Sequence, residues 1–226
     1  MNSSTVGLII LAAGASTRMG TPKQLLTYRG RSFIRHITES AICASQRSTE
    51  RLRTELAEVS RRSQRFAIAS VCQPIAVVLG ANAEQIKPEI SQLPVQIVEN
   101  QQWAEGMSSS IRVGLEALLG VNQNLEAVAI VLCDQPFVSF PILDRIVEAY
   151  HLTSKPIIAS EYAGTLGVPV LFSCTLFSEI MALKSTEGAK QIIRKHIHEV
   201  FSVPFPEGSI DIDTPNDYQQ FQSRSR

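Results

Sequence analysis

The stretch VGLIILAAGASTRMGTPKQLL, residues 6–26, joins a run of apolar residues to a loop of small and polar ones. The run Val6–Ala13 does not alternate with polar residues, and this pattern indicates a strand that is buried on both faces, as in a parallel sheet. The loop that follows holds Gly14 and Gly20 and has two charges, Arg18 and Lys23. In open α/β sheets ligands bind at the carboxyl ends of the strands, so this loop is the first place to look for a site.

Further apolar runs follow along the chain, and they alternate with stretches of helical spacing. Stretches with apolar residues at helical spacing, within residues 33–41, 111–119 and 142–150, lie between further apolar runs. Strands that alternate with helices predict a layered α/β fold with a mostly parallel central sheet and right-handed crossovers. The further strands are expected at Ile75–Leu79, Val95–Val98, Ala127–Cys133, Pro156–Ala159 and Val168–Phe172.

Composition excludes several classes of protein. Of the 226 residues, 44% are hydrophobic and 19% are charged, which is typical of a folded globular chain and not of a disordered one. Lys+Arg and Asp+Glu are equal at 21 each, so no overall field attracts nucleic acid or an anionic membrane. The run Val6–Ala13 is too short to span a bilayer. The four cysteines have no metal-ligand spacing, so we expect reduced thiols in a cytoplasmic protein.

We expect a single domain over residues 1–226 with one interruption. Between Arg47 and Arg65 lie six arginines against three glutamates. This insert, near residues 47–70, is interpreted either as a solvated helix or lid that extends the preceding helix, or as a basic element that docks a partner or substrate.

The loop after the first strand has the composition of an anion site. Small side chains leave its backbone N–H groups accessible, and Arg18 and Lys23 can neutralise phosphate oxygens. The spacing matches neither the Walker A loop nor the GxGxxG dinucleotide motif. A plain strand-to-helix turn with two surface cations is the alternative.

Two acidic turns are candidates for a metal site. Asp134 follows a buried strand in VLCDQP (131–136), and Asp213 lies in DIDTPNDY (211–218). Mg²⁺ sites typically use one or two carboxylates together with substrate phosphates and waters. Thr214 and Pro215 are expected to begin a final helix, and capping or turn formation is the alternative role for Asp213.

The segment ENQQWAEGMSSSIRVGL, residues 99–115, opens a helix with a glycine and three serines. Such an N-terminus can bind a base, a ribose or a phosphate, although serines also cap helices without a ligand. The run is not a Gly-x-Ser-x-Gly nucleophile elbow, which argues against a hydrolase.

At residues 11–26 the sequence resembles the molybdopterin-type nucleotidyltransferases, whose first block reads LAAGxSxRMGxxKxLL. The likeness is strongest to the molybdenum cofactor cytidylyltransferases, because Ala13 and Pro22 stand where guanylyltransferases usually have glycine and often have aspartate. It covers nearly the whole chain apart from the insert. The other similar blocks are VVLGANAEQI (77–86), NQQWAEGMSSSIRVGL (100–115), LCDQP (132–136), GTLGVPVLF (164–172) and DIDTPNDY (211–218).

The resemblance implies a three-layer Rossmann-like nucleotidyltransferase fold, with CTP bound mainly by residues 1–120 and the acceptor mainly by residues 121–226. The implied reaction transfers a cytidylyl group from CTP to the terminal phosphate of molybdenum-molybdopterin and releases pyrophosphate. Arg18 and Lys23 would hold the triphosphate, and Asp134 and Asp213 would carry Mg²⁺, with Arg18, Lys23 and Asp134 as the catalytic residues. The nucleotide would contact Leu11, Ala12, Ala13 and Gly14 through the backbone, and Gly80, Gly106 and Ser108 around the base and ribose.

Two alternatives remain at this point. The first is a guanylyltransferase, or another nucleotidyltransferase with a small phosphate acceptor. The second is a non-catalytic carrier or chaperone of the molybdenum cofactor, for which the Arg-rich insert is the best support. In each case the expected partners are small molecules and a target molybdoenzyme, with no nucleic acid and no membrane, and the chain is expected to be a monomer.

Overall fold

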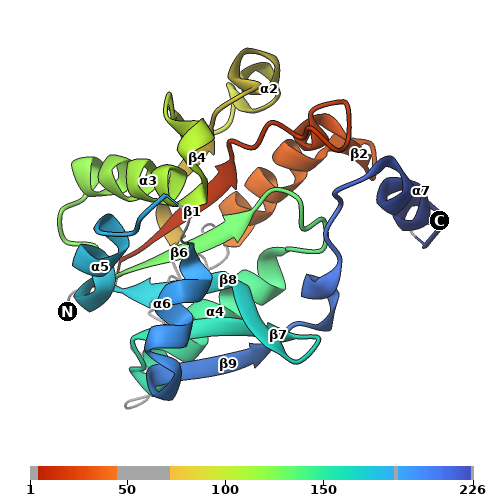
Figure 1. Cartoon of the computed structure of the whole chain (residues 1–226). Coiled ribbons are helices and arrows are strands. Elements are labelled where there is room, and N and C mark those ends of the chain that lie inside the picture. Colours follow the sequence, from red (N-terminus) through yellow and green to blue (C-terminus); the bar gives the residue numbers. More distant parts are fainter. Residues whose placement is uncertain (1–4, 45–71, 186–187, 225–226) are drawn as a thin grey trace, which may run out of the picture.

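A computed structural model describes residues 5–44, 72–185 and 188–224 of the chain. Seven strands form one sheet in the order β5-β4-β1-β6-β8-β7-β9 (Figure 1). The insert predicted near residues 47–70 lies outside the described residues. The strands are β1 (Val6–Ala12), β4 (Cys72–Leu79), β5 (Gln96–Glu99), β6 (Ala127–Leu132), β7 (Ile157–Tyr162), β8 (Thr165–Ser173) and β9 (Val200–Pro204).

The mostly parallel sheet predicted from the apolar runs is confirmed. β1 pairs in parallel with β4 on one side and β6 on the other, and β4 pairs in parallel with β5. β8 runs antiparallel to both β6 and β7, and β7 pairs in parallel with β9. The six predicted strands all correspond to strands of this sheet.

The apolar-run pattern did not predict β9 or the short hairpin of β2 (Thr27–Tyr28) and β3 (Arg31–Ser32). Among the strands that the structure describes, β9 pairs with β7 alone, and it exposes Phe201 while it buries Val203. Ser202 interrupts the apolar residues of this five-residue strand, so a search for continuous apolar runs does not find it. The two-residue strands of the hairpin are too short to carry a pattern.

Helices cover both faces of the sheet (Figure 1). One face packs against the helical residues 33–44 and against α2 (Ala83–Ile90), α4 (Phe140–Thr153) and α7 (Pro215–Arg224). The other face packs against α3 (Met107–Val121), α5 (Phe177–Met181) and α6 (Ala189–Lys195). Short 3₁₀ turns complete the described elements: η1 (Lys23–Leu25), η2 (Trp103–Glu105), η3 (Cys174–Leu176), η4 (Ile197–Glu199) and η5 (Pro206–Ser209). Within the described ranges, no helix is both long and apolar enough to cross a membrane.

The central strand β1 is buried along its whole length. Leu8 and Ile10 belong to the core on one side of the sheet, and Ile9 and Leu11 belong to the core on the other. Each buried aliphatic side chain contributes about 1.5–3 kcal/mol relative to exposure. A strand that is held on both faces and paired on both edges fixes the position of the loop that follows it.

Candidate active site

Three neighbouring parallel strands end at the same edge of the sheet. β1 lies between β4 and β6, so the loop after Ala12 lies between the residues that follow Leu79 and those that follow Leu132. The backbone N–H of Ala81 donates to the carbonyl of Ala13, and that of Cys133 donates to Leu11. The two neighbouring strand ends are therefore both tied to β1 where its loop begins.

A buried glutamine supports the glycine loop from inside. Gln24, which is only 2% exposed, donates from its amide nitrogen to the carbonyls of Ala12 and Gly14, both at 2.9 Å. Its amide oxygen accepts from Ser16 Oγ, which also accepts from the backbone N–H of Lys23. These bonds fix the two ends of the loop to each other and leave small side chains on its open side.

Lys23 lies between the two predicted metal-ligand carboxylates. Its Nζ is 2.5 Å from Oδ2 of Asp134 and 3.0 Å from Oδ1 of Asp213. Arg18 donates from Nη2 to the other oxygen of Asp213 at 2.8 Å, although its own side chain is 70% exposed. The four charged residues singled out in the sequence thus form one cluster of two cations and two anions.

The pKa values of the cluster reflect this pairing. Burial disfavours the charged form of Lys23, but the carboxylates of Asp134 and Asp213 outweigh it and raise the lysine pKa above its ordinary value. The hydrogen bond from Lys23, together with the charges of Lys23 and Arg18, lowers the pKa of Asp213. Lys23 therefore remains an ammonium and Asp213 a carboxylate at neutral pH.

Backbone and amide contacts bring the two acidic turns together. The N–H of Ile212 donates to the carbonyl of Asp134 at 3.2 Å, and the side chain of Gln135 donates to the carbonyl of Gly208 at 3.0 Å.

Asp213 lies just before the start of α7, and the residues after it cap this helix. Thr214 Oγ1 accepts from the N–H of Asp217, whose carboxylate accepts in return from the backbone of Thr214, which is a reciprocal N-terminal cap. The helix start expected at Thr214 and Pro215 is confirmed, and Asp217 takes part in the cap while Asp213 binds the cations.

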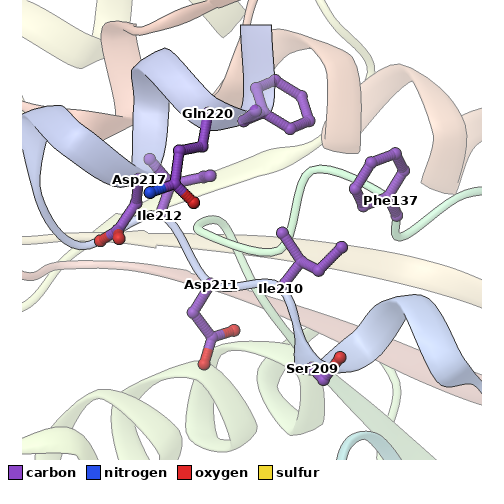
Figure 2. A pocket seen from close by; sticks show the side chains of 8 residues that line it. Phe137, Ser209, Ile210, Asp211, Ile212, Asp217 and Gln220 are labelled. Atoms are coloured by element: carbon purple, nitrogen blue, oxygen red, sulfur yellow. The ribbon is translucent and has the colours of Figure 1, made fainter. Parts of the chain in front are cut away.

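A small cavity of about 200 Å³ lies on the α7 side of the C-terminal acidic turn. Figure 2 shows the side chains of Asp211 and Asp217, which extend in different directions from this cavity. The apolar side chains of Phe137 and Ile210 also line it. Partial desolvation and the nearby charges of Asp134 and Asp213 raise the pKa of Asp211 to about 6. Asp211 and Asp213 thus have opposite pKa shifts, because burial dominates at Asp211 and the hydrogen bond from Lys23 dominates at Asp213.

The carboxylate pair suits a divalent cation. Oδ1 of Asp134 is buried and has no hydrogen-bond partner among the described residues, so one oxygen of this group can still take a ligand. No cluster of three or more acidic, His or Cys side chains that could hold a metal occurs in the described part of the chain. Two carboxylates complemented by substrate phosphates and waters are the usual arrangement for Mg²⁺.

A larger cavity of about 370 Å³ opens beside the cluster and is the candidate nucleotide site. Leu11, Ala12, Ala13, Gly14, Lys23, Gly106 and Asp134 line it, as the sequence predicted for nucleotide or metal contacts. Arg18, Gly80 and Ser108, which were predicted to contact the nucleotide, are not part of this lining, and Asp213 reaches it only through Lys23. Further lining residues are Ala15, Gln24, Trp103, Ala104, Met107, Ser110, Leu132 and Cys133.

Gly80 and Ser108 lie outside the lining of this cavity. A Cβ on Gly80 would lie 2.5 Å from the carbonyl oxygen of Ala13 and 2.7 Å from Cβ of Trp103, so glycine is needed here for close packing behind the loop. Ser108 is fully buried, and its hydroxyl has no partner among the described residues.

The first turn of α3 is held by Asn100. Its amide nitrogen donates to the hydroxyls of Ser109 at 2.8 Å and Ser110 at 2.9 Å. Gly106, just before the helix, has φ +114°, and a Cβ there would collide with the carbonyl oxygen of Ser185. Two of the three serines therefore have a structural role, which the sequence alone left open.

Sequence reasoning did not assign Gln24 and Trp103 to the site. Trp103 lies within the block at residues 100–115, lines the cavity and is 37% exposed as a residue. A large aromatic side chain just before a Gly-Ser-rich helix start was an available signal for it. Gln24 gave no such signal, because its burial depends on the turn η1 and not on a sequence period.

Three curated proteins have similar sequences and carry three different names. Nicotine blue oxidoreductase of Paenarthrobacter nicotinovorans is 30% identical over 144 residues, which is 63% of this chain and only 56% of that protein. Purine catabolism protein PucB of Bacillus subtilis is 24% identical over 93% of this chain and 92% of its own length. Molybdenum cofactor cytidylyltransferase of Escherichia coli is 21% identical over 95% of this chain and 94% of its own length.

Solved structures share the fold. A nucleotidyl transferase from Methanothermobacter thermautotrophicus has a TM-score of 0.73 at 18% identity and covers 97% of both chains. Rv0371c of Mycobacterium tuberculosis, in a complex with manganese, has a TM-score of 0.65 at 22% identity and covers 97% of this chain and 98% of its own. At these identities the likeness establishes the Rossmann-like nucleotidyltransferase fold.

The family is established by the sequence itself. The profile of the MobA-like NTP transferase domain matches residues 8–50 and 54–200, which include the glycine loop, the strand end at Asp134 and most of the sheet. This match confirms the resemblance seen in the sequence blocks. The chain belongs to the family of proteins with a MobA-like NTP transferase domain.

Proposed function

We propose that this nucleotidyltransferase moves a cytidylyl group from CTP to the terminal phosphate of molybdenum-molybdopterin, and so forms the cytosine dinucleotide cofactor and pyrophosphate. The observation that carries the proposal is the position of the Lys23–Asp134–Asp213 cluster beside a cavity lined by the glycine loop. The named E. coli relative and the Ala13 and Pro22 positions support CTP and the molybdopterin acceptor.

The cavity is suited to a reaction that needs no general base. A terminal phosphate is already ionised at neutral pH, so it can attack the α-phosphorus in line without losing a proton to the protein. No histidine is among the residues that line the cavity, and burial raises the pKa of the Cys133 thiol far above neutral pH. Positioning and neutralisation of charge would therefore supply the rate enhancement.

Each part of the site has a proposed role. The backbone of Leu11–Gly14 would face the triphosphate, and Lys23 with Arg18 would offset the charge that develops on the departing pyrophosphate. Gly106 would frame the base or ribose from the cavity wall, whereas Gly80 and Ser108 would act from behind the wall by shaping it. The acceptor would bind mainly through residues 121–226.

Asp134 and Asp213 would hold Mg²⁺, which when bound supplies a Lewis acid that neutralises phosphate oxygens. The unpartnered oxygen of Asp134 and the acidic pair are the features that fit it. The manganese complex of a structural neighbour supports the use of Mn²⁺ as a second ion in any assay.

The test is an in vitro transfer reaction with the purified protein, Mg²⁺ and molybdenum-loaded molybdopterin. We expect pyrophosphate release and the cytosine dinucleotide with CTP, and little product with GTP. Product with GTP instead would favour the guanylyltransferase alternative. Cofactor binding without pyrophosphate from either nucleotide would overturn the proposal and favour a carrier.

A further inference from the structure

Lys23 and a divalent cation compete for the same oxygens. Oδ2 of Asp134 and Oδ1 of Asp213 both accept hydrogen bonds from one ammonium, at 2.5 and 3.0 Å. Mg²⁺ binds carboxylate oxygens at about 2.0–2.1 Å, so an ion that bridged these two oxygens would occupy the space of the ammonium. The lysine side chain is only 17% exposed, and solvent would screen the repulsion between two such neighbouring cations only weakly.

The cluster is electrically balanced as it stands. Lys23 and Arg18 supply two positive charges to Asp134 and Asp213, and of these two carboxylates the largely exposed Arg18 pairs with Asp213. A divalent ion can replace the lysine only if the ammonium finds another anionic partner. The cavity that Lys23 also lines is where the triphosphate of the proposed substrate would lie.

We infer that Lys23 is a displaceable counter-ion: it holds the Asp134–Asp213 pair in the empty enzyme and moves to the nucleotide phosphates when a divalent ion takes that pair. This inference rests on the proposed nucleotide site and deepens it. Its consequence is positive coupling between nucleotide and metal, because the nucleotide draws away the ammonium that blocks the ion, and the ion frees that ammonium to pair with the phosphates. Without a nucleotide, the protein keeps its own cation in the metal position and binds the ion weakly.

The unpartnered oxygen of Asp134 is an independent indication. A buried carboxylate oxygen without a hydrogen bond is costly, and Lys23 satisfies only the other oxygen of that group. Asp134 would therefore offer a divalent ion an oxygen that Lys23 does not occupy.

The experiment measures Mn²⁺ binding in the absence of nucleotide, by the loss of the free-ion EPR signal, for the wild-type chain, Lys23→Met and Lys23→Arg. Met removes the cation with a side chain of similar length, whereas Arg keeps the charge. We expect Lys23→Met to bind Mn²⁺ roughly tenfold more tightly than the wild type or better, and Lys23→Arg to bind it as weakly as the wild type. Equal or weaker Mn²⁺ binding by Lys23→Met would overturn the inference.

Two further measurements keep the result interpretable. Mn²⁺ should raise the Tm of Lys23→Met more than that of the wild type, which tests the same claim if the variant is less stable. CTP binding in the presence of Mg²⁺, followed by the fluorescence of Trp103, the only tryptophan in the chain, should be weakened in Lys23→Met. A wild-type protein that binds no nucleotide at all would refute the proposed function, while the Mn²⁺ comparison would still decide the role of Lys23.

Discussion

Nζ of Lys23 lies 2.5 Å from Oδ2 of Asp134, although 111 residues separate the two along the chain. Their nearness follows from the sheet, because Lys23 belongs to the turn after β1 and Asp134 follows its parallel neighbour β6. Asp213 joins them because the N–H of Ile212 is bonded to the backbone of Asp134. The site is therefore assembled at one edge of the sheet from three distant parts of the sequence.

Replacement of Asp134 by asparagine should remove transfer activity and leave the fold in place. Asn keeps the shape of the side chain but removes the charge that would bind the metal. We expect kcat to fall by a factor on the order of 10² to 10³, measured as pyrophosphate release. Glu116→Gln, which neutralises an exposed carboxylate on α3, is the matched control and should keep full activity. Near-normal turnover by Asp134→Asn would remove this residue from the mechanism.

The close packing behind the glycine loop predicts a contrast between two glycines. In Gly80→Ala the new Cβ would lie 2.5 Å from the backbone oxygen of Ala13, so the loop must move. We expect a loss of about 1–3 kcal/mol in the free energy of unfolding and weaker nucleotide binding. Gly120→Ala, on the exposed side of α3 with nothing within 4 Å, should instead stabilise by about 0.5–1 kcal/mol. Denaturant unfolding of both variants checks the contrast, and equal effects would contradict it.

Residue chemistry made some of these features predictable and others not. Buried parallel strands give continuous apolar runs, and for this reason β1 and β6 and the residues after them could be placed from the sequence. The cluster of Lys23 with Asp134 and Asp213 could not, because a direct ion pair depends on how a strand end, a turn and a C-terminal segment meet. The sequence predicted Lys23 at the triphosphate and the acids at the metal, whereas the structure has them in contact.

The places of Gly80 and Ser108 also could not be predicted, because they too depend on how distant parts of the chain meet. Gly80 and Ser108 were expected to contact the nucleotide, and the structure places them outside the cavity lining. A glycine that allows a close backbone approach looks the same in a sequence whether the neighbour is a ligand or the chain itself. In the folded chain the close neighbours of Gly80 are Ala13 and Trp103.

Gln24 is expected to be a positioning residue for the loop. Gln24→Ala would leave the carbonyls of Ala12 and Gly14 without their side-chain donor, and the free energy of unfolding should fall by about 1–3 kcal/mol. Because the loop would lose its bracing, the KM for the nucleotide should rise more than kcat falls. Gln85→Ala, an exposed glutamine on α2, should change neither value. A variant with a lower kcat at unchanged KM would argue against a positioning role.

His196 should make the stability of the α5–α6 region depend on pH. Its Nε2 lies 3.0 Å from Glu179 and its Nδ1 lies 2.9 Å from Glu199, and these hydrogen bonds raise the histidine pKa above 6.5. Burial works against the charge of Glu179, but the bonds from His196 and Lys195 outweigh it and lower its pKa below 4.5. A raised histidine pKa stabilises the fold below 6.5 and ceases to do so as the pH rises through the folded-state value. A lowered carboxyl pKa stabilises it above 4.5 and ceases to do so as the pH falls.

Taken together, the raised pKa of His196 and the lowered pKa of Glu179 mean that this ion pair stabilises the fold most between about pH 4.5 and 6.5. We therefore expect His196→Asn to lower the Tm at pH 5.5 and to have almost no effect at pH 9, where the imidazole is neutral in any case. Lys195→Met is the control, because it removes another cation that pairs with Glu179, at 3.0 Å, and leaves the imidazole in place. NMR titration of His196 should give a pKa above 6.5 that falls in Glu179→Gln. An equal loss of Tm at pH 5.5 and pH 9 for His196→Asn would show that packing, and not the charge of the imidazolium, is what the residue contributes.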